Sequence, residues 1–160
     1  MKHKGFTIVE LLIVIAVIAI LASITVVSYS FMRGDSMDSK IKAVVKTAGD
    51  ALSLKDGQTG SRVAGKGYFN VADGMDTLVP QYLKQGYRDG VESNRVPSDD
   101  QIFRWYDCAD GSGGFVIYAS LNNPTSDDIA NFQKYRTACG HNDSHAPTSG
   151  THVYNYGQVF

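Results

Sequence analysis

The sequence lacks a strong excess of charge of either sign. Its 15 Lys and Arg residues nearly balance 16 Asp and Glu residues, and the formal net charge is −1. A protein that binds nucleic acid through its phosphates carries a basic excess, and an acidic disordered tail carries a block of carboxylates. Neither pattern is present. Nucleic acid is therefore a possible partner, but the net charge does not indicate it.

The sequence also lacks the residue patterns of common enzymes. We find no Ser-His-Asp arrangement, no phosphate-binding loop and no paired carboxylates in a recognisable frame. These patterns are what nucleophilic, phosphoryl-transfer and acid–base chemistry require. We therefore expect a protein that is not an enzyme and that needs no cofactor.

Charged side chains are missing altogether from the 22 residues between Leu11 and Met32. A helix over residues 6–32 would be roughly 40 Å long, enough to cross a hydrocarbon core of about 30 Å. Lys2 and Lys4 precede this segment, so the positive-inside rule places the N-terminus in the cytoplasm and the rest of the chain outside.

Glu10 is the exception near the start of the apolar segment. A carboxylate costs about 2.5–3.5 kcal/mol at the bilayer centre and less near a helix end, so we expect Glu10 to have a partner. A cleaved secretory signal would need a small-residue site after the apolar stretch, and Ala22-Ser23 is a poor one. A plain signal anchor leaves Glu10 unexplained.

The first 30 residues follow a recognisable pattern of basic leader, glycine, aromatic residue, carboxylate and long apolar run. The residues are Lys2-His3-Lys4-Gly5-Phe6-Thr7-Ile8-Val9-Glu10. This pattern resembles the N-terminus of type IV pilins and of the related type II secretion pseudopilins. The resemblance implies that a prepilin peptidase cuts between Gly5 and Phe6 and methylates the new amine of Phe6. Cleavage would change the net charge from −1 to −3, because Lys2 and Lys4 leave with the leader.

The resemblance also implies how the subunits assemble. Glu10 of one subunit would pair with the Phe6 amine of a neighbour, so that each buried charge neutralises the other. The protein would be a structural subunit of a type IV pilus-like filament, a homo-oligomer that supports adhesion, twitching motility or DNA uptake. Its partners would be the prepilin peptidase and the pilus assembly platform. It would lie in the cytoplasmic membrane before assembly and in an extracellular filament afterwards.

Two alternatives to this function stay open. The first is a pseudopilin that forms a short periplasmic piston for protein secretion. The second is a membrane-anchored binding protein that never polymerises.

We expect an α+β fold in which a long N-terminal helix packs on a small antiparallel sheet. The chain divides into a leader (1–5), a transmembrane and assembly helix (6–32), an amphipathic second half of that helix (33–54) and a globular head (55–160). Gly34 weakens the helix, and a bend there is plausible. Beyond it an apolar stripe at helical spacing predicts packing on the sheet; the stripe is Ile41, Val44, Val45, Ala48 and Leu52. The helix should end before the loop Asp56–Gly60.

The head should contain three or four strands. Alternation predicts a hairpin from strands over Gln101–Cys108 and Phe115–Leu121. Tyr68–Val71 is a short edge strand or a loop, and His152–Tyr156 is a final strand. A helical turn within 75–83 and a short helix over Asp127–Lys134 complete the prediction.

The sequence has only two cysteines, Cys108 and Cys139. Beyond a membrane segment they would meet an oxidising environment, where a disulfide is the default and two free buried thiols are the alternative. A bridge closing a loop of about 32 residues would contribute roughly 3.5–4 kcal/mol in the chain-entropy model.

Two further groups of residues have possible binding roles. Cys139, His141, Asp143 and His145 could hold a metal, but their spacing matches no zinc pattern, so we expect exposed loop histidines and no metal site. No Asp-x-Asp-x-Asp-Gly loop indicates calcium. Four aromatic residues near arginines could stack on single-stranded DNA, although core packing explains them better; these aromatic residues are Tyr82, Tyr87, Trp105 and Tyr106.

Overall fold

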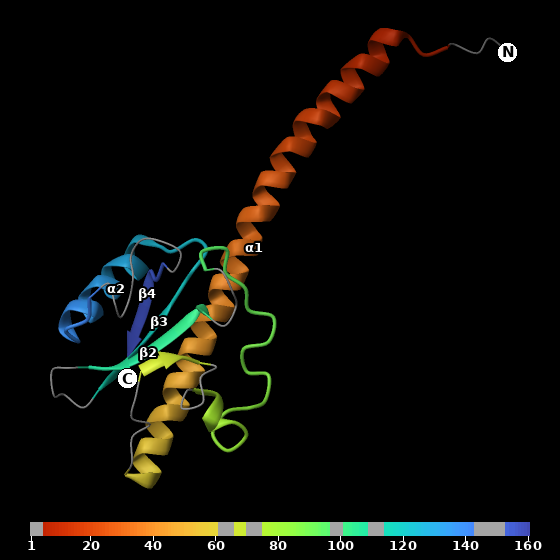
Figure 1. The fold of residues 1–160 in the computed structure, drawn as a ribbon. Helices are drawn as coiled ribbons and strands as arrows, with labels where there is room; N and C mark the ends of the chain where they lie inside the picture. Colours follow the sequence, from red (N-terminus) through yellow and green to blue (C-terminus); the bar gives the residue numbers. More distant parts are fainter. Residues whose placement is uncertain (1–4, 61–65, 70–74, 97–100, 109–113, 143–152) are drawn as a thin grey trace. The chain divides into compact units, whose positions relative to one another are not determined.

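The computed structural model describes residues 5–60, 66–69, 75–96, 101–108, 114–142 and 153–160 (Figure 1). Their element order is α1 (Ile8–Thr59), β1 (Lys66–Tyr68), the 3-10 helix η1 (Met75–Leu78), β2 (Phe103–Asp107), β3 (Phe115–Ala119), α2 (Ser126–Ala138) and β4 (Tyr156–Val159). The chain divides into two compact units, Met1–Gly34 and Asp35–Phe160. The fold is α+β, as predicted, with a long N-terminal helix.

The first unit contains the apolar half of α1. The helix is unbroken through Ser23–Ser28, a stretch of β-branched and hydroxyl residues that are weaker helix formers. The hydroxyls there donate to carbonyls of the preceding turn, Ser23 to Ile20 at 2.7 Å and Thr25 to Ala22 at 2.9 Å. These polar side chains are therefore satisfied within the helix itself.

The C-terminal end of α1 lies beyond the predicted boundary. The helix continues to Thr59 instead of ending before Asp56, so the predicted range 33–54 is too short. Gly60 has a φ of 60° and its N–H donates to the Asp56 carbonyl at 2.9 Å. Because glycine adopts this left-handed conformation without strain, Gly60 is the residue that ends the helix.

The second unit is built on a four-stranded antiparallel sheet in the order β1-β2-β3-β4. The predicted hairpin is confirmed, since β2 pairs with β3 and Trp105 lies opposite Ile117. Every residue of β3 is buried. Its alternate side chains enter two cores, one shared with the apolar stripe of α1 and one shared with α2. The sheet is thus a middle layer between the two helices (Figure 1).

The last strand lies further along the chain than predicted. It covers Tyr156–Val159 and not His152–Tyr156, and His152 lies outside the described residues. The reason is Asn155, whose side-chain oxygen accepts from Leu121 N–H at 2.8 Å and whose amide donates to Leu121 C=O at 2.9 Å. The carboxamide takes the place of a peptide group, so regular pairing begins one residue later.

The helix α2 begins with a capping box. Thr125 is the N-cap, and Asp128 and Thr125 satisfy each other's backbone N–H groups. The helix ends at Ala138, later than the predicted Lys134. Lys42 of α1 contacts the same Asp128 carboxylate at 2.7 Å, and this ion pair links the two helices of the head.

Candidate functional site

The start of α1 is fixed by two side chains that face each other. Residues 5–7 are not helical, and the helix begins at Ile8. The Glu10 carboxylate accepts hydrogen bonds from the backbone N–H and the hydroxyl of Thr7, both at 2.8 Å. The Glu10 N–H lies 3.3 Å from the Thr7 hydroxyl oxygen and donates to it. This reciprocal arrangement is a capping box with Thr7 as the N-cap.

The capping box gives Glu10 a partner inside its own chain. The sequence predicted a partner for Glu10 but placed it on a neighbouring subunit. The signal for the internal partner was available, because Thr7-x-x-Glu10 before an apolar run is the sequence signature of a capping box. A carboxylate in the first turn also interacts favourably with the positive end of the helix dipole.

The predicted cut site, Gly5–Phe6, lies just outside this capped helix. Both residues are exposed, and a side chain at Gly5 would meet nothing within 4 Å. Phe6 is 84% exposed. The peptide bond between them is therefore neither part of the helix nor covered by other described residues. Residues 1–4 lie outside the described part of the chain.

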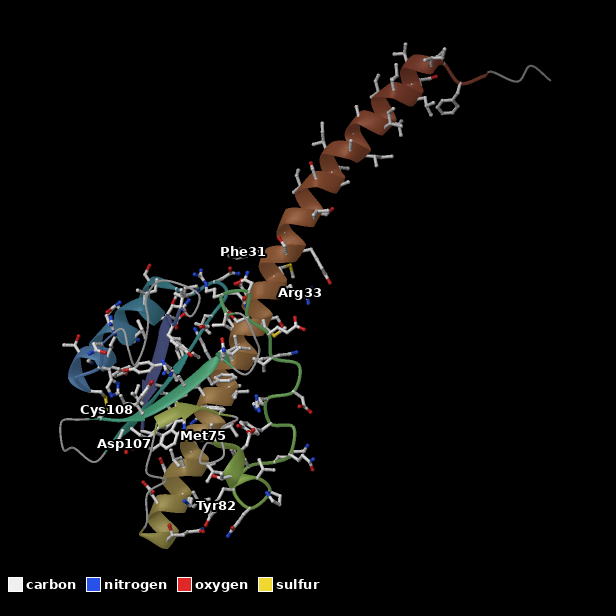
Figure 2. All side chains as sticks on the ribbon, in the orientation of Figure 1. Phe31, Arg33, Met75, Tyr82, Asp107 and Cys108 are labelled. Carbon is white, nitrogen blue, oxygen red and sulfur yellow. A yellow bond between two sulfur atoms is a disulfide. The ribbon has the colours of Figure 1, made fainter. Side chains whose placement is uncertain are left out.

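The residues after the predicted cut site form an apolar helix with an open surface. The described large apolar side chains from Phe6 to Met32 are between 48% and 84% exposed. Figure 2 shows the side chains before Arg33 projecting away from the helix axis. By length and composition α1 can cross a membrane, and none of its most apolar window is buried. Signal sequences share these properties. The helix alone therefore does not separate a signal sequence from a membrane anchor, and the motif at Gly5–Glu10 is needed to distinguish them.

The two cysteines are joined by a disulfide, as predicted, between the end of β2 and the end of α2. Cys139 is therefore not available to a metal. Asp143 and His145 lie outside the described residues, and among the described ones no three His, Cys, Asp or Glu side chains form a metal-binding group.

His141 does not fit the expected exposed loop histidines. Its ring is half-buried and bonds to the Tyr118 hydroxyl at 2.8 Å and the Asp107 carbonyl at 3.1 Å. The sequence offered no signal for these contacts, because they depend on how β2, β3 and the end of α2 come together.

The aromatic residues considered for nucleic-acid stacking belong to the core. Trp105 and Tyr106 are 1% and 4% exposed, and Tyr82 and Tyr87 pack against the larger core cluster. Their ring faces are consequently not arranged as an exposed stacking platform.

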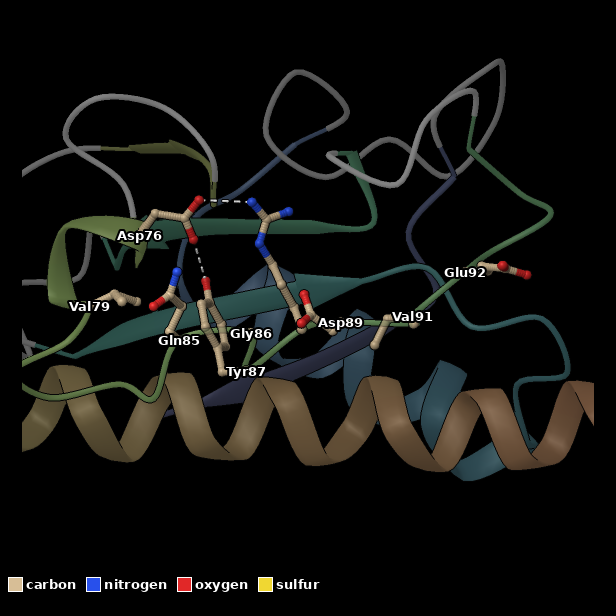
Figure 3. A pocket seen from close by; sticks show the side chains of 10 residues that line it. Asp76, Val79, Gln85, Gly86, Tyr87, Asp89, Val91 and Glu92 are labelled. Carbon is tan, nitrogen blue, oxygen red and sulfur yellow. Dashed lines mark hydrogen bonds and ion pairs between the residues drawn. The ribbon is translucent and has the colours of Figure 1, made fainter.

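The head also contains a cavity of about 530 Å³ beside the segment 76–92 (Figure 3). The Asp76 carboxylate accepts from the Tyr87 hydroxyl at 2.9 Å and pairs with Arg88 at 2.8 Å. Burial, together with the Asp76 carboxylate, raises the pKa of Tyr87 well above its ordinary value. These contacts fix the segment against η1.

Comparison with known proteins adds one match, and it falls on the capped N-terminus. Residues 1–26 match the family model described as the prokaryotic N-terminal methylation motif. No curated protein and no solved structure matches the chain. The motif implies processing by a prepilin peptidase and assembly into a pilus-like filament, and with the apolar helix it suggests membrane anchoring before assembly. The chain therefore carries, at its N-terminus, the signature of type IV pilin-like precursors.

Proposed function

We propose that this protein is a structural subunit of a type IV pilus-like filament. It is cut between Gly5 and Phe6, methylated on the Phe6 amine and polymerised through the helix over residues 6–32. The observation that most supports the proposal is the exposed apolar surface of that helix directly after the capped cut site. Such a surface needs lipid before assembly and neighbouring helices afterwards.

Cleavage changes the charge at the end of the helix in the direction that assembly requires. It removes Lys2 and Lys4, which hold the N-terminus on the cytoplasmic side. It also creates a positive amine at Phe6, close in sequence to the Glu10 carboxylate. Pairing of Glu10 in one subunit with the Phe6 amine of the next neutralises both charges and sets the register between subunits.

The head is displayed on the outside of the filament. Subunits related by a head-to-tail operator that does not close continue to add, so the product is a fibre rather than a ring. Adhesion, motility or DNA uptake would be properties of that fibre.

Electron microscopy of cells labelled with an antibody to the head tests the proposal. The cells need an active prepilin peptidase and assembly platform, and a strain without the protein is the control. We expect long labelled fibres. Labelled puncta confined to the membrane would contradict the proposal and favour a pseudopilin or a plain anchor.

Intact-protein mass spectrometry tests the processing step in the same cells. The expected mass corresponds to residues 6–160 with one methyl group and the disulfide. A protein that retains Met1 while the peptidase is active would contradict cleavage at Gly5–Phe6.

A further inference from the structure

The side chain of His141 connects three elements of the head. Its Nδ1 lies 2.8 Å from the Tyr118 hydroxyl of β3, and its Nε2 lies 3.1 Å from the Asp107 carbonyl oxygen of β2. Its backbone N–H donates to the Arg136 carbonyl of α2 at 2.9 Å. The ring also lies against Tyr106 and Tyr118, with centroids 5.3 Å and 5.7 Å apart.

These contacts define the protonation state of the ring. A carbonyl oxygen only accepts hydrogen bonds, so Nε2 must carry a proton and donate it to Asp107. In the neutral ring Nδ1 is then the acceptor, and the Tyr118 hydroxyl donates to it. The neutral tautomer with its proton on Nε2 therefore satisfies all three groups at once.

Protonation of the ring disturbs this arrangement. It puts a second proton on Nδ1, which then points at the Tyr118 hydroxyl. The hydroxyl must turn to accept, and its own proton loses its acceptor. Burial raises the pKa of the Tyr118 phenol, so Tyr118 does not ionise to receive the new proton. The Arg136 guanidinium adds a positive charge to the surroundings of the same hydroxyl.

The ionisable groups that the contacts between described residues bring close to the ring do not offset this cost. From β2, Tyr106 contributes a neutral ring with Arg104 positioned 5.2 Å from its centroid. Asp107 contributes its carbonyl, while strand alternation directs its carboxylate to the opposite face of the sheet, the face of Trp105. From α2, Tyr135 packs beside the same cluster.

We propose that His141 forms an acid-sensitive contact. In its neutral form the ring holds the segment that follows α2 against β2 and β3, and protonation of the ring breaks this contact. A contact that requires the neutral ring contributes stability above about pH 6.5, where a free histidine titrates, and loses it as the pH falls. The disulfide keeps Cys139 attached to β2, so the release begins at Gly140.

NMR of the full mature chain in detergent micelles tests this contact in the unsubstituted protein. At pH 8 the ring nitrogens of His141 should report a proton on Nε2. Between pH 7 and pH 5.5 the signals of His141 and Tyr118 should change together. The protection of the His141 amide, which compares its exchange rate with that of an unstructured peptide at the same pH, should fall at least about tenfold, because its N–H loses its bond to Arg136. A proton on Nδ1 at pH 8, or titration of His141 without a loss of protection, would overturn the proposal.

A pair of matched variants assigns the acid response to His141. His141→Gln keeps one donor and one acceptor but does not titrate, so its amide protection at residues 140–142 should be the same at pH 5.5 and pH 8. His152→Gln should respond to acid as the unaltered protein does. An acid response that persists in His141→Gln would overturn the proposal, as would a response that His152→Gln abolishes.

Tyr118→Phe supplies the second variant in case His141→Gln does not fold. Without the hydroxyl, protonation at Nδ1 costs no hydrogen bond, and the acid-induced loss of amide protection should shrink to less than half. An undiminished response in a folded Tyr118→Phe protein would contradict the role given to the hydroxyl.

Discussion

At the scale of single residues, a capping box starts both of the α-helices that the structure describes. Thr7 and Glu10 cap α1, and Thr125 and Asp128 cap α2, in each case with a hydroxyl residue and a carboxylate three positions apart. The two carboxylates differ in their second partner. Asp128 has Lys42 of its own chain at 2.7 Å, whereas we propose that Glu10 receives its cation from a neighbouring subunit.

Two variants separate the capping role of Glu10 from its charge. Glu10→Gln keeps an oxygen that accepts from Thr7 but removes the charge, so we expect filament yield to fall at least about tenfold, the equivalent of 1.4 kcal/mol. Thr7→Val keeps the charge and removes the cap, which costs about 1 kcal/mol at the helix start, and filaments should still form. Filament yield is measured by quantitative immunoblotting of sheared fibres. The pairing role of Glu10 fails if Glu10→Gln assembles normally.

The ion pair between Lys42 and Asp128 makes the head sensitive to acid. Burial alone would raise the pKa of Asp128, but hydrogen bonds from Lys42 and Thr125 outweigh it and hold the pKa below the ordinary value of 3.8. A carboxyl group with a lowered pKa contributes stability above that value and loses it as the pH falls through the folded pKa.

We therefore expect the melting temperature of the head to drop on acidification below about pH 4. Part of this drop should disappear in Lys42→Met, which keeps the aliphatic packing and removes the charge. Thermal unfolding followed by circular dichroism between pH 2 and pH 6 measures both proteins. Asp50, which pairs with Lys46 on the exposed side of α1, provides a control, and Lys46→Met should not alter the acid dependence. Identical pH profiles for Lys42→Met and the parent would contradict the assignment.

At the scale of elements, the head half of α1 fits the rest of the head through a close approach at Gly49. This glycine is buried, and a methyl group there would overlap the ring of Phe160. Phe160 in turn stacks on Phe115 with ring centroids 5.4 Å apart, and the two residues exchange backbone hydrogen bonds. The absence of a side chain at Gly49 thus lets the last residue of the chain lie between α1 and the sheet.

Gly49→Ala should accordingly destabilise the head although alanine is the better helix former. Overpacking costs about 1–3 kcal/mol, and the gain in helix propensity of about 1 kcal/mol offsets only part of it. Gly57→Ala on the same helix is the matched control, because a side chain there meets nothing within 4 Å and should raise stability. Urea unfolding of both variants measures the difference. Equal stabilisation by both substitutions would show that Phe160 moves aside without cost.

The elements that sequence reasoning found are those with local signals. Alternation located β2 and β3, and the helix predicted over Asp127–Lys134 lies within α2. The stripe on α1 identified the residues that face the sheet. The errors fell where a distant contact overrides the local pattern. Asn155 displaced the start of β4 by bonding Leu121, and His141 is held by groups from β2 and β3. At the candidate site, the prediction of Gly5, Phe6 and Glu10 rests on the resemblance of the N-terminal pattern to pilin precursors, and the methylation motif matches the same stretch. The capping box between Thr7 and Glu10 also has a local signal, Thr7-x-x-Glu10, which the prediction for Glu10 did not use.

At the scale of the whole molecule, the disulfide joins the end of β2 to the end of α2 across 31 residues. Cys108 and Cys139 are both buried within the core cluster that α2 shares with the sheet. The bridge therefore holds α2 on one face of the sheet, and α1 covers the other face.

Reduction of this bridge should destabilise the head. The chain-entropy model gives about 3.5–4 kcal/mol for a loop of this length, so the melting temperature should fall by roughly 10 °C or more. Thermal scans with and without dithiothreitol at pH 8 measure the effect, and the double variant Cys108→Ser with Cys139→Ser serves as a control that should not respond. An unchanged melting temperature in the parent protein after confirmed reduction would contradict a stabilising role.

The hydroxyl groups along the apolar half of α1 have a consequence for how this helix changes its surroundings. Ser23, Thr25 and Ser28 each direct their proton to a carbonyl of their own helix, the last to Ile24 at 3.1 Å. A hydroxyl whose proton is already satisfied within its own helix has no hydrogen bond to exchange when the helix leaves one apolar medium for another. In the proposed assembly, transfer from lipid to a bundle of like helices is then close to isoenergetic for these three hydroxyls. The direction of transfer would be set by the packing of side chains and by the proposed pairing of Glu10 with the Phe6 amine of a neighbour.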